Sequence, residues 1–387
     1  MAQRQMEHVD LAIVGAGIMG LAHAVHAALA GLSVAVFERD PAADGASVRN
    51  FGMLAVAAQA PGQQMDDARR ALRCWEYVAQ QAGIAMQQTG CLFLARQTEE
   101  MIVLEEYAAC DGVADHGVHM LARGECDRYV ANLRSDTIIG GMWSPDVWKV
   151  DQRQAVSKIV KWLAGAHGVS FHFSSEVLSV GSSRVETSTG SFRADKIVVC
   201  GGDEFDTLFP EAFREARVTR CRLQMLRTHP QPDGWQLKPF ILGGLSMTRY
   251  AAFASCPGLP ELVEWQRKNH ADHLANGIHV IACQEADGSI TIGDSHAFGD
   301  AVGEERSLEI DLLILDDLAG MISLPETGIA ERWLGHYAHL PGTRTLKLSP
   351  VDGVTAVTVT NGQGMTHAFA IAADVLNGVG HQISEHY

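Results

Sequence analysis

Val9-Asp-Leu-Ala-Ile-Val14, followed by Gly15-Ala-Gly17-Ile-Met-Gly20, is the stretch of sequence that decides the fold. Its first half is a short apolar run of the kind that forms a buried parallel strand, and its second half is a glycine turn. An alanine-rich helical segment, 21–30, comes next, and a second apolar run, 33–37, ends at Glu38. This order of strand, turn, helix, strand and acid predicts an α/β fold that begins with a Rossmann-type nucleotide-binding unit.

Each residue of this unit has a physical role in the prediction. Gly15 permits the tight turn, Gly17 lets backbone approach a pyrophosphate, and Gly20 lets the helix pack closely on the sheet. The helix begins at Ile18, where free N–H groups and the positive end of the helix dipole favour phosphate. Glu38 would accept hydrogen bonds from the ribose hydroxyls. The motif by itself does not distinguish FAD from NAD.

Composition limits the function. A chain of 387 residues, 47% hydrophobic and 20% charged, suits a globular protein of two domains. A formal charge of −16 excludes nucleic acid as a partner, because it leaves no basic face for phosphates. No apolar run reaches the roughly 20 residues of a membrane-spanning helix. The polar segment 1–7 lacks the layout of a signal peptide, so we expect a cytoplasmic protein without a membrane span.

The eight cysteines are scattered singly, and none forms a CxxC pair. This spacing argues against a structural zinc site or a dithiol redox centre, and we predict no metal site. Free, mostly buried thiols in a reducing compartment are the simplest interpretation.

The segment after Glu38, Asp44-Gly-Ala-Ser47-Val-Arg-Asn50-Phe-Gly52-Met-Leu54, favours FAD over NAD. Ser47, Asn50 and Gly52 match a "Ser-x-x-Asn-x-Gly" pattern, and at this point the chain resembles the D-amino-acid-oxidase-like flavoproteins. That family includes glycine oxidase, sarcosine oxidase and the D-amino-acid dehydrogenases. The resemblance implies that this segment lies beside the flavin ring.

Two further blocks carry the resemblance along the chain. The strand-like run 194–200 leads into Gly201-Gly202, which the family uses near the adenine, where Val177 is expected to present backbone atoms. Near the C-terminus, a strand at 355–360 and a glycine turn at 361–366 precede a helix that extends to Asn377. The N-terminus of that helix would stabilise an anionic reduced flavin.

The resemblance implies FAD as cofactor. No cysteine follows Cys283, so the C-terminal thioether of some relatives cannot form and we expect non-covalent binding. The expected cofactor-binding residues are Gly15, Gly17, Ile18, Met19, Gly20, Glu38, Arg39, Ser47, Arg49, Asn50, Gly52, Met53, Val177, Gly201, Gly362, Gly364, Met365 and Thr366.

The resemblance also implies a second, interleaved domain. Segments 240–253, 277–284 and 289–293 have the composition of strands of an antiparallel sheet, which would cover the flavin as a substrate domain. We therefore expect an α/β chain, α+β overall, with a discontinuous organisation. The expected FAD-binding domain comprises 1–85, 148–210 and 344–387, and the expected substrate domain comprises 86–147 and 211–343.

Two departures from the family concern the reaction. Arg332-Trp-Leu-Gly335-His336-Tyr337 resembles the family's "Trp-x-Gly" strand, but the arginine that clamps a substrate carboxylate in glycine-oxidase-like members is absent after Gly335. This absence argues against a standard α-amino acid as substrate. Where sarcosine oxidases carry a lysine, the strand 288–293 carries Thr291, which leaves oxygen and another electron acceptor both open.

The segments 49–53 and 332–337 together look like a subgroup of the family associated with aminophosphonate breakdown. The expected function is oxidation of the C–N bond of a small anionic amine, best an N-alkylated 2-aminoethylphosphonate. An amino-acid oxidase or dehydrogenase, an oxidoreductase acting on a hydroxy acid and a non-catalytic flavin sensor remain alternatives. The flavin would carry the chemistry, so no catalytic side chain is named. The candidates for binding the substrate are Arg49, Arg249, Tyr250, His296, His336 and Tyr337.

Overall fold

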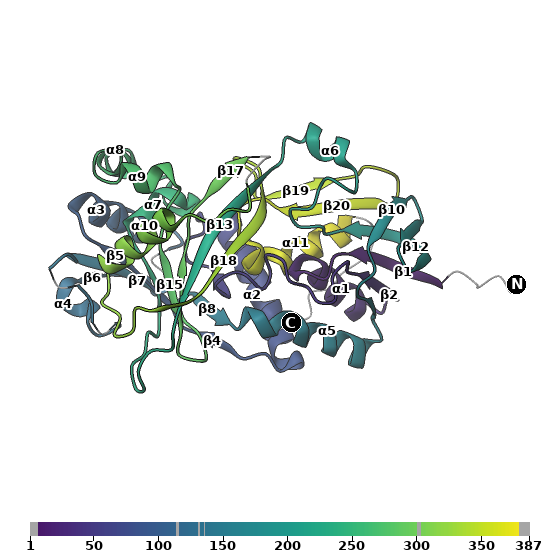
Figure 1. Cartoon of the computed structure of the whole chain (residues 1–387), viewed down its shortest axis with the longest axis horizontal. Helices are drawn as coiled ribbons and strands as arrows, with labels where there is room; N and C mark the ends of the chain where they lie inside the picture. The colour runs from purple at the N-terminus through teal and green to yellow at the C-terminus, as the bar shows by residue number, and fades with distance from the viewer. Residues whose placement is uncertain (1–6, 114–115, 131, 135, 300–302, 379–387) are drawn as a thin grey trace, which may run out of the picture.

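The structure, a computed structural model, describes residues 7–113, 116–130, 132–134, 136–299 and 303–378. The chain forms two lobes (Figure 1). One lobe contains the first strand, β1 (Glu7–Val14), and the last helix, α11 (Gly364–Gly378). The other is built on a second sheet that includes the long strands β13 (Thr219–Thr228) and β18 (Ile329–His339). The predicted α/β class with an interleaved second sheet is confirmed.

The first sheet has the parallel centre of a Rossmann-type unit. β1 lies between β2 and β12 and pairs in parallel with both, β9 pairs in parallel with β2, and β20 with the end of β12. β10, β11 and β19 add antiparallel edges. The strands other than β1 are β2 (Val34–Phe37), β9 (Ser170–His172), β10 (Val177–Gly181), β11 (Arg184–Thr187), β12 (Gly190–Val199), β19 (Thr345–Leu348) and β20 (Val354–Val359).

Both faces of this sheet are covered, which is why its central strands are continuous apolar runs. On one face, α1 (Ile18–Leu29) packs against α11 and α5 (Gln152–His167), and α11 packs against α2 (Gln63–Ala82). On the other face, Phe37 of β2 belongs to the same buried cluster as Val185 of β11 and Phe192 of β12. Burial of both faces leaves only the ends of the strands open to a ligand.

The register of the parallel strands brings their carboxyl ends together. Val14 at the end of β1 is the partner of Phe37 at the end of β2 and of Val199 at the end of β12. The residues that follow these strands therefore lie at one edge of the sheet. This edge is where open α/β sheets bind their ligands.

The glycine turn after β1 depends on close backbone contacts. Gly15 has φ +98°, and a Cβ there would collide with the carbonyl oxygen of Cys200. A Cβ on Gly20 would collide with the carbonyl oxygen of Gly15 and approach Ile13 Cγ2 to 3.2 Å. The first turn of α1 can therefore lie against the end of β1 only without these side chains.

The second sheet is mostly antiparallel, with one parallel pair between β14 and β5. β3, β8 and β4 form a third, small sheet, with β8 at its centre. The strands of the second sheet other than β13 and β18 are β5 (Cys91–Ala95), β6 (His119–Ala122), β7 (Gly140–Ser144), β14 (Phe240–Leu242), β15 (Ile281–Gln284), β16 (Ile290–Gly293) and β17 (Ala297–Gly299). The third sheet comprises β3 (Met53–Ala55), β4 (Met86–Gln88) and β8 (Val147–Val150).

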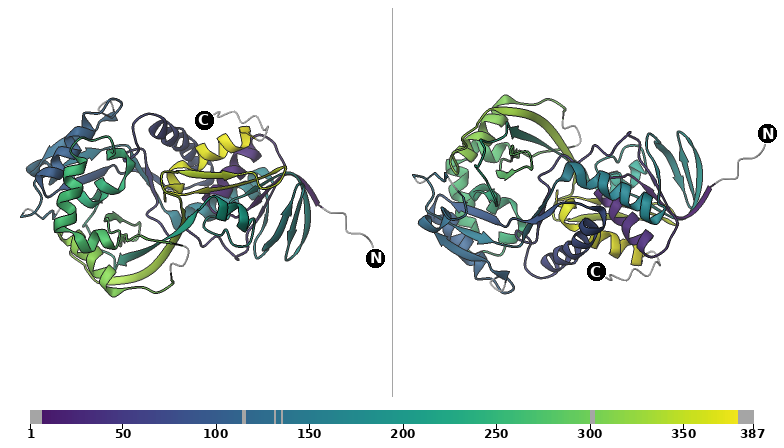
Figure 2. Two further views of the ribbon diagram at one scale, coloured as in Figure 1. Left: turned by 90° about the horizontal axis from the view of Figure 1, so that it is seen from above. Right: turned by 90° about the horizontal axis from the view of Figure 1, so that it is seen from below.

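Helices lie on the outer side of the second lobe, as Figure 2 shows from above and below. In the described part of the chain, no helix has both the length and the apolar character needed to cross a membrane. The remaining helices are α3 (Thr98–Ala108), α4 (Arg123–Cys126), α6 (Pro210–Glu215), α7 (Gly244–Arg249), the 3-10 helix η2 (Ala251–Phe253), α8 (Leu259–Asn269), α9 (Ala271–Ala275) and α10 (Leu308–Ala319).

One predicted strand is wrong. Segment 240–253 was expected to be extended, but only 240–242 is a strand, and α7 and η2 follow it. The strand ends at Gly243-Gly244, where a Cβ on Gly244 would collide with the Glu100 carboxylate. The apolar residues after this pair are buried as one helical turn rather than as a strand. Of the predicted strand 277–284, only 281–284 is extended, as β15, and the predicted strand 289–293 is confirmed as β16.

Gly20→Ala should destabilise the protein by about 3 kcal/mol, because its methyl group must displace the backbone of the glycine turn. Gly165→Ala is the matched control, since Gly165 is also helical and a Cβ there meets nothing within 4 Å. The control should be more stable than wild type by about 0.5 to 1 kcal/mol. Urea unfolding measures both, and equal stability of the two variants would contradict the packing role of Gly20.

Candidate functional site

A cavity of about 580 Å³ opens at the carboxyl edge of the first sheet. Its lining begins with residues that directly follow β1, β2 and β12, namely Gly15, Glu38 and Cys200. It continues to residues of the second lobe, including Arg249 and Tyr337. The cavity therefore joins the nucleotide-binding edge of one lobe to the other lobe.

The glycine-turn end of the cavity is shaped for a phosphate group. Gly17 lies on the cavity, and the atom nearest to a Cβ built on it is Ser47 Oγ, at 3.1 Å. The Ile18 N–H at the start of α1 donates to Ser47 Oγ (2.9 Å). Glu38 Oε2 accepts from the Ala16 N–H (2.9 Å), which ties the acid to the turn. The N-terminus of α1, Gly17 and Glu38 thus lie together, as binding of a dinucleotide requires.

The loop after Glu38 is held in shape by its own polar side chains. Asn50 Nδ2 donates to the carbonyl groups of Ala46 (2.8 Å) and Ser47 (2.9 Å), and its Oδ1 accepts from the Gly52 N–H (2.7 Å). Arg49 Nη2 pairs with Asp44 Oδ2 at 2.8 Å. These contacts therefore hold the loop in place along the cavity. The sequence pattern alone did not predict them.

The C-terminal turn closes the opposite side of the cavity. Gly362 has φ +76°, and a Cβ there would lie 3.2 Å from the Tyr337 ring. Gly364 begins α11, so the N-terminal end of this helix faces the cavity together with Met365. Two helix N-termini, those of α1 and α11, thus meet one cavity, which favours an anionic ligand.

The predicted cofactor-binding residues divide into two groups. Four of them do not line the cavity but support the segments that do. Gly20 supports the glycine turn, Gly52 lies against the Val150 carbonyl group, Met53 begins β3, and Thr366 Oγ1 accepts from the Ala55 N–H (3.1 Å). The others line the cavity: Gly15, Gly17, Ile18, Met19, Glu38, Arg39, Ser47, Arg49, Asn50, Val177, Gly201, Gly362, Gly364 and Met365.

At the other end of the cavity, Arg249 and Tyr337 form a pair. Arg249, the last residue of α7, donates from Nη2 to the Tyr337 hydroxyl at 2.9 Å. Its Nε is buried and has no hydrogen-bond partner among the residues that the structure describes. Burial raises the pKa of Tyr337 well above its usual value, so the hydroxyl stays neutral. The pair offers N–H donors and one positive charge to an anion.

The remaining predicted substrate residues are more dispersed. Tyr250 lies on the cavity with its ring centroid 5.5 Å from that of His279. His336 also borders the cavity, and its Nε2 lies 3.5 Å from Glu304 Oε1. Arg49 is already paired with Asp44. Of the six candidates, Arg249, Tyr337 and His296 are brought closest together, with a His296–Tyr337 centroid distance of 6.3 Å.

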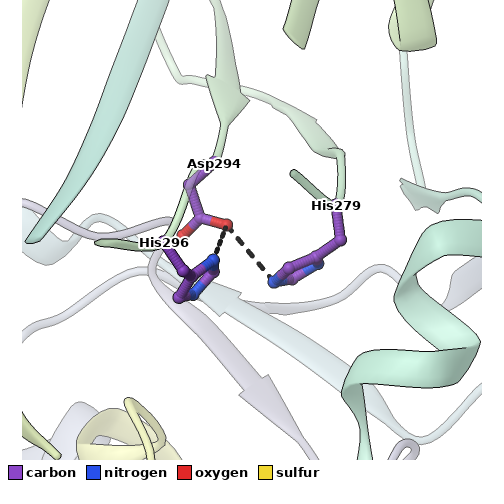
Figure 3. Close-up of side chains that lie close together, drawn as sticks. All are labelled: His279, Asp294 and His296. Carbon is purple, nitrogen blue, oxygen red and sulfur yellow. Dashed lines mark ion pairs between the residues drawn. The ribbon is translucent and has the colours of Figure 1, made fainter. Parts of the chain in front are cut away.

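Two residues that the sequence analysis did not select complete this end of the cavity. Asp294 directly follows β16, and His279 precedes β15, so their side chains meet beside His296 (Figure 3). Asp294 Oδ1 lies 3.3 Å from His279 Nε2 and 3.8 Å from His296 Nδ1. The position of Asp294 at a strand end was the one available signal. The donor atoms of these three side chains lie within 4.8 Å of one another, although no metal site was predicted.

Burial determines the charge of this cluster. It raises the pKa of Asp294 to about 7, while the Arg249 guanidinium opposes that rise. It lowers the pKa of His296 to about 3 and that of His279 well below its usual value. Both imidazoles are therefore neutral near pH 7. Asp294 and Arg249 carry the charges of this end of the cavity.

The strand β16, in which sarcosine oxidases carry a lysine, is linked through Glu285 to a lysine of another strand. Thr291 Oγ1 donates to Glu285 Oε1 (2.5 Å), and Lys149 Nζ lies 3.1 Å from Glu285 Oε2. Lys149, on β8, also donates to the Phe51 carbonyl group (2.9 Å), and Phe51 lines the cavity. A partly buried cation therefore lies behind the cavity wall, although residue 291 is a threonine.

Comparison with known proteins identifies the family. The model of the DAO family, described as FAD dependent oxidoreductase, matches residues 10–376. The bifunctional protein ThiO/ThiG of Synechocystis is 31% identical over 67% of this chain and 40% of its own length. Glycine oxidase of Geobacillus kaustophilus is 26% identical over 50% of this chain and 54% of its own length. The matches thus span about half, or less, of these curated relatives.

A solved structure supports the fold. L-proline dehydrogenase from P. horikoshii superposes with a TM-score of 0.77 at 18% identity, over 96% of this chain and 94% of that one. The family match covers nearly the whole described chain, including every element that borders the cavity. The chain belongs to the DAO family of FAD-dependent oxidoreductases, and its cofactor is FAD.

Proposed function

We propose that the chain oxidises the C–N bond of a small amine that carries an anionic head, with an N-alkylated 2-aminoethylphosphonate as the first substrate to test. The observation that carries the proposal is the Arg249–Tyr337 pair in the same cavity as the FAD-binding edge. The family match and the names of relatives that act on glycine and on L-proline support an amino compound as substrate.

Arg249 compensates for the arginine that is absent after Gly335. Its guanidinium reaches the cavity from α7 rather than from β18, and its Nε has no hydrogen-bond partner within the described segments of the chain. A phosphonate carries close to two negative charges and three oxygens, so it uses more N–H donors than a carboxylate does. The N-terminus of α11 adds dipole stabilisation at the same cavity.

An amino-acid oxidase or dehydrogenase is the second candidate. A guanidinium also binds a carboxylate through two parallel hydrogen bonds, and the related proteins named above act on amino acids. The substrate screen described below separates the two candidates. A non-catalytic flavin sensor is excluded if any amine reduces the bound flavin.

FAD held at the glycine turn and the N-terminus of α11 would supply the hydride acceptor for oxidation of the carbon next to nitrogen. The residues of the chain bind the anionic head through Arg249, orient the amine and exclude water by burial. Water then hydrolyses the released imine to an aldehyde and an amine. Oxygen or another acceptor would reoxidise the flavin, and Lys149 is a partly buried cation behind the cavity wall.

We also propose the cytoplasm as the location. All eight cysteines are free, and seven of them are buried. Free thiols fit a reducing compartment.

We predict that purified protein is yellow and that acid precipitation releases FAD into the supernatant. No cysteine follows Cys283, and the buried Cys283 Sγ accepts a hydrogen bond from Lys149 Nζ (3.4 Å), so the C-terminal thioether of some relatives is not expected. Absorption spectra and chromatography of the supernatant measure the release. Flavin retained in the pellet would contradict non-covalent binding.

Gly17→Val should abolish FAD binding while leaving a folded protein. Valine would occupy the approach of the pyrophosphate, whereas the nearest protein atom to a new Cβ is the side-chain oxygen of Ser47 at 3.1 Å. Flavin content and circular dichroism measure the two effects. Normal flavin content in this variant would show that the phosphates bind elsewhere.

Arg249→Ala should raise KM at least tenfold, since a charged hydrogen bond contributes about 1.5 to 3 kcal/mol. Arg249→Lys should recover little of this loss, because an ammonium cannot reproduce the planar fork. Arg267→Ala is the matched control, as that arginine is exposed on α8. Steady-state kinetics with each substrate measures the effect, and a fall in kcat would show that the contact also orients the C–H bond.

The substrate screen is anaerobic flavin reduction across aminophosphonates, amino acids and simple amines. N-alkylated 2-aminoethylphosphonate should reduce the flavin fastest. Faster reduction by glycine, sarcosine or D-alanine would overturn the phosphonate assignment in favour of the second candidate, and an unchanged KM in Arg249→Ala would remove Arg249 from the anion site.

A further inference from the structure

We infer that Asp294 is the amine subsite of this cavity: its carboxylate binds the substrate ammonium and takes the proton that must leave before oxidation. The inference rests on the proposed function, which names an amine with an anionic head but assigns no residue to its nitrogen. It makes Asp294 a catalytic residue and divides this end of the cavity into an anion subsite at Arg249 and an ammonium subsite at Asp294.

The first observation is that one cavity holds a guanidinium and an ionisable carboxyl group that are not ion-paired with each other. Arg249 donates to the Tyr337 hydroxyl and forms no ion pair with Asp294. Asp294 Oδ1 is buried and has no hydrogen-bond partner in the described part of the chain. A carboxylate is retained in such a place only at a cost, unless a ligand pairs with it. A zwitterion with its anion at Arg249 and its ammonium at Asp294 would satisfy both charges at once.

The second observation is that the neighbouring imidazoles cannot act as the missing cation. Burial keeps both neutral, and each is engaged elsewhere through Nδ1, that of His296 with the Gly277 carbonyl group (3.0 Å) and that of His279 with Ser246 Oγ (3.3 Å). The charged and titratable groups that face Asp294 are His279, His296, Arg249, Tyr250, Cys221 and Tyr337. Arg249 is the one permanent cation among them.

The geometry favours this use of the cluster over a metal site. The His279 and His296 rings are stacked, with centroids 5.0 Å apart and an angle of 19° between planes. A metal ion lies in the plane of each imidazole that binds it, and stacked rings do not share a plane. His296 Nδ1, which faces Asp294, is also bonded to Gly277. The stacked rings instead form a neutral wall beside the carboxylate.

The proton step balances within the cavity. The N–H bond of the ammonium breaks, its electron pair stays on nitrogen, and a new O–H bond forms on Asp294. An ion pair becomes a neutral amine and a neutral acid, a change that a buried site favours. The Asp294 pKa of about 7 suits exchange of a proton near neutral pH. The nitrogen lone pair is then available when the C–H bond is broken.

The test compares two matched ligands, 2-aminoethylphosphonate and ethylphosphonate, which differ only in the amine. Binding is followed on the FAD-loaded protein through the perturbation of the flavin spectrum. Asp294→Asn should weaken 2-aminoethylphosphonate at least tenfold and leave ethylphosphonate within about twofold, because a single charged contact is lost. Arg249→Ala should weaken both. Asp195→Asn, at an exposed carboxylate, should change neither.

A pH profile separates a proton acceptor from a residue that only positions the ligand. In wild type, the rate of anaerobic flavin reduction should rise between pH 6 and 8 as Asp294 loses its proton, and in Asp294→Asn this rise should disappear. The wild-type profile keeps the inference testable if the variant does not fold. Equal weakening of both ligands, an unchanged affinity for the amine, or a stoichiometric metal ion lost in Asp294→Asn would overturn it. If no amine reduces the flavin, the proposed function fails, while the two-ligand comparison still tests the amine subsite.

Discussion

The alignment of the carboxyl ends of β1, β2 and β12 is the constraint on which the rest of the structure depends. Val14, Phe37 and Val199 are register partners, so the glycine turn, the acid Glu38 and the Cys200–Gly202 turn emerge at one edge. Close backbone contact at the glycine turn places the start of α1 at this edge. The strand register and the close packing at the glycine turn together form the cavity. A Rossmann-type edge with a second lobe over it is suited to FAD.

The second lobe contributes the ionisable groups that would determine where the anion and the amine of a substrate bind. Arg249 ends α7 and Asp294 follows β16, and the partly buried guanidinium and the buried carboxyl group are not paired with each other. Buried charges of this kind are costly to the free protein, so they indicate a ligand that pairs with them. The flavin supplies the oxidation, and the chain supplies the positions of the anion and the amine.

The cofactor half of the site could be predicted from sequence because its signals are local. Gly15, Gly17 and Glu38 act through spacing along one βαβ unit, and the structure places them on one cavity. The substrate half depends on contacts between distant segments, such as Arg249 with Tyr337. His279 and Asp294 were missed because only the tertiary fold brings them beside His296. The error at 240–253 has the same origin, since burial favoured a helix in an apolar segment.

A crystal structure of the FAD-loaded protein with 2-aminoethylphosphonate, grown under anaerobic conditions, would test the central claim most directly. We expect the pyrophosphate to lie at the glycine turn and the isoalloxazine to lie between the segment after Glu38 and the N-terminus of α11. The account also predicts that the phosphonate oxygens lie within hydrogen-bond distance of Arg249 and that the nitrogen lies within hydrogen-bond distance of Asp294. A phosphonate bound away from Arg249, or a nitrogen turned away from Asp294, would contradict it.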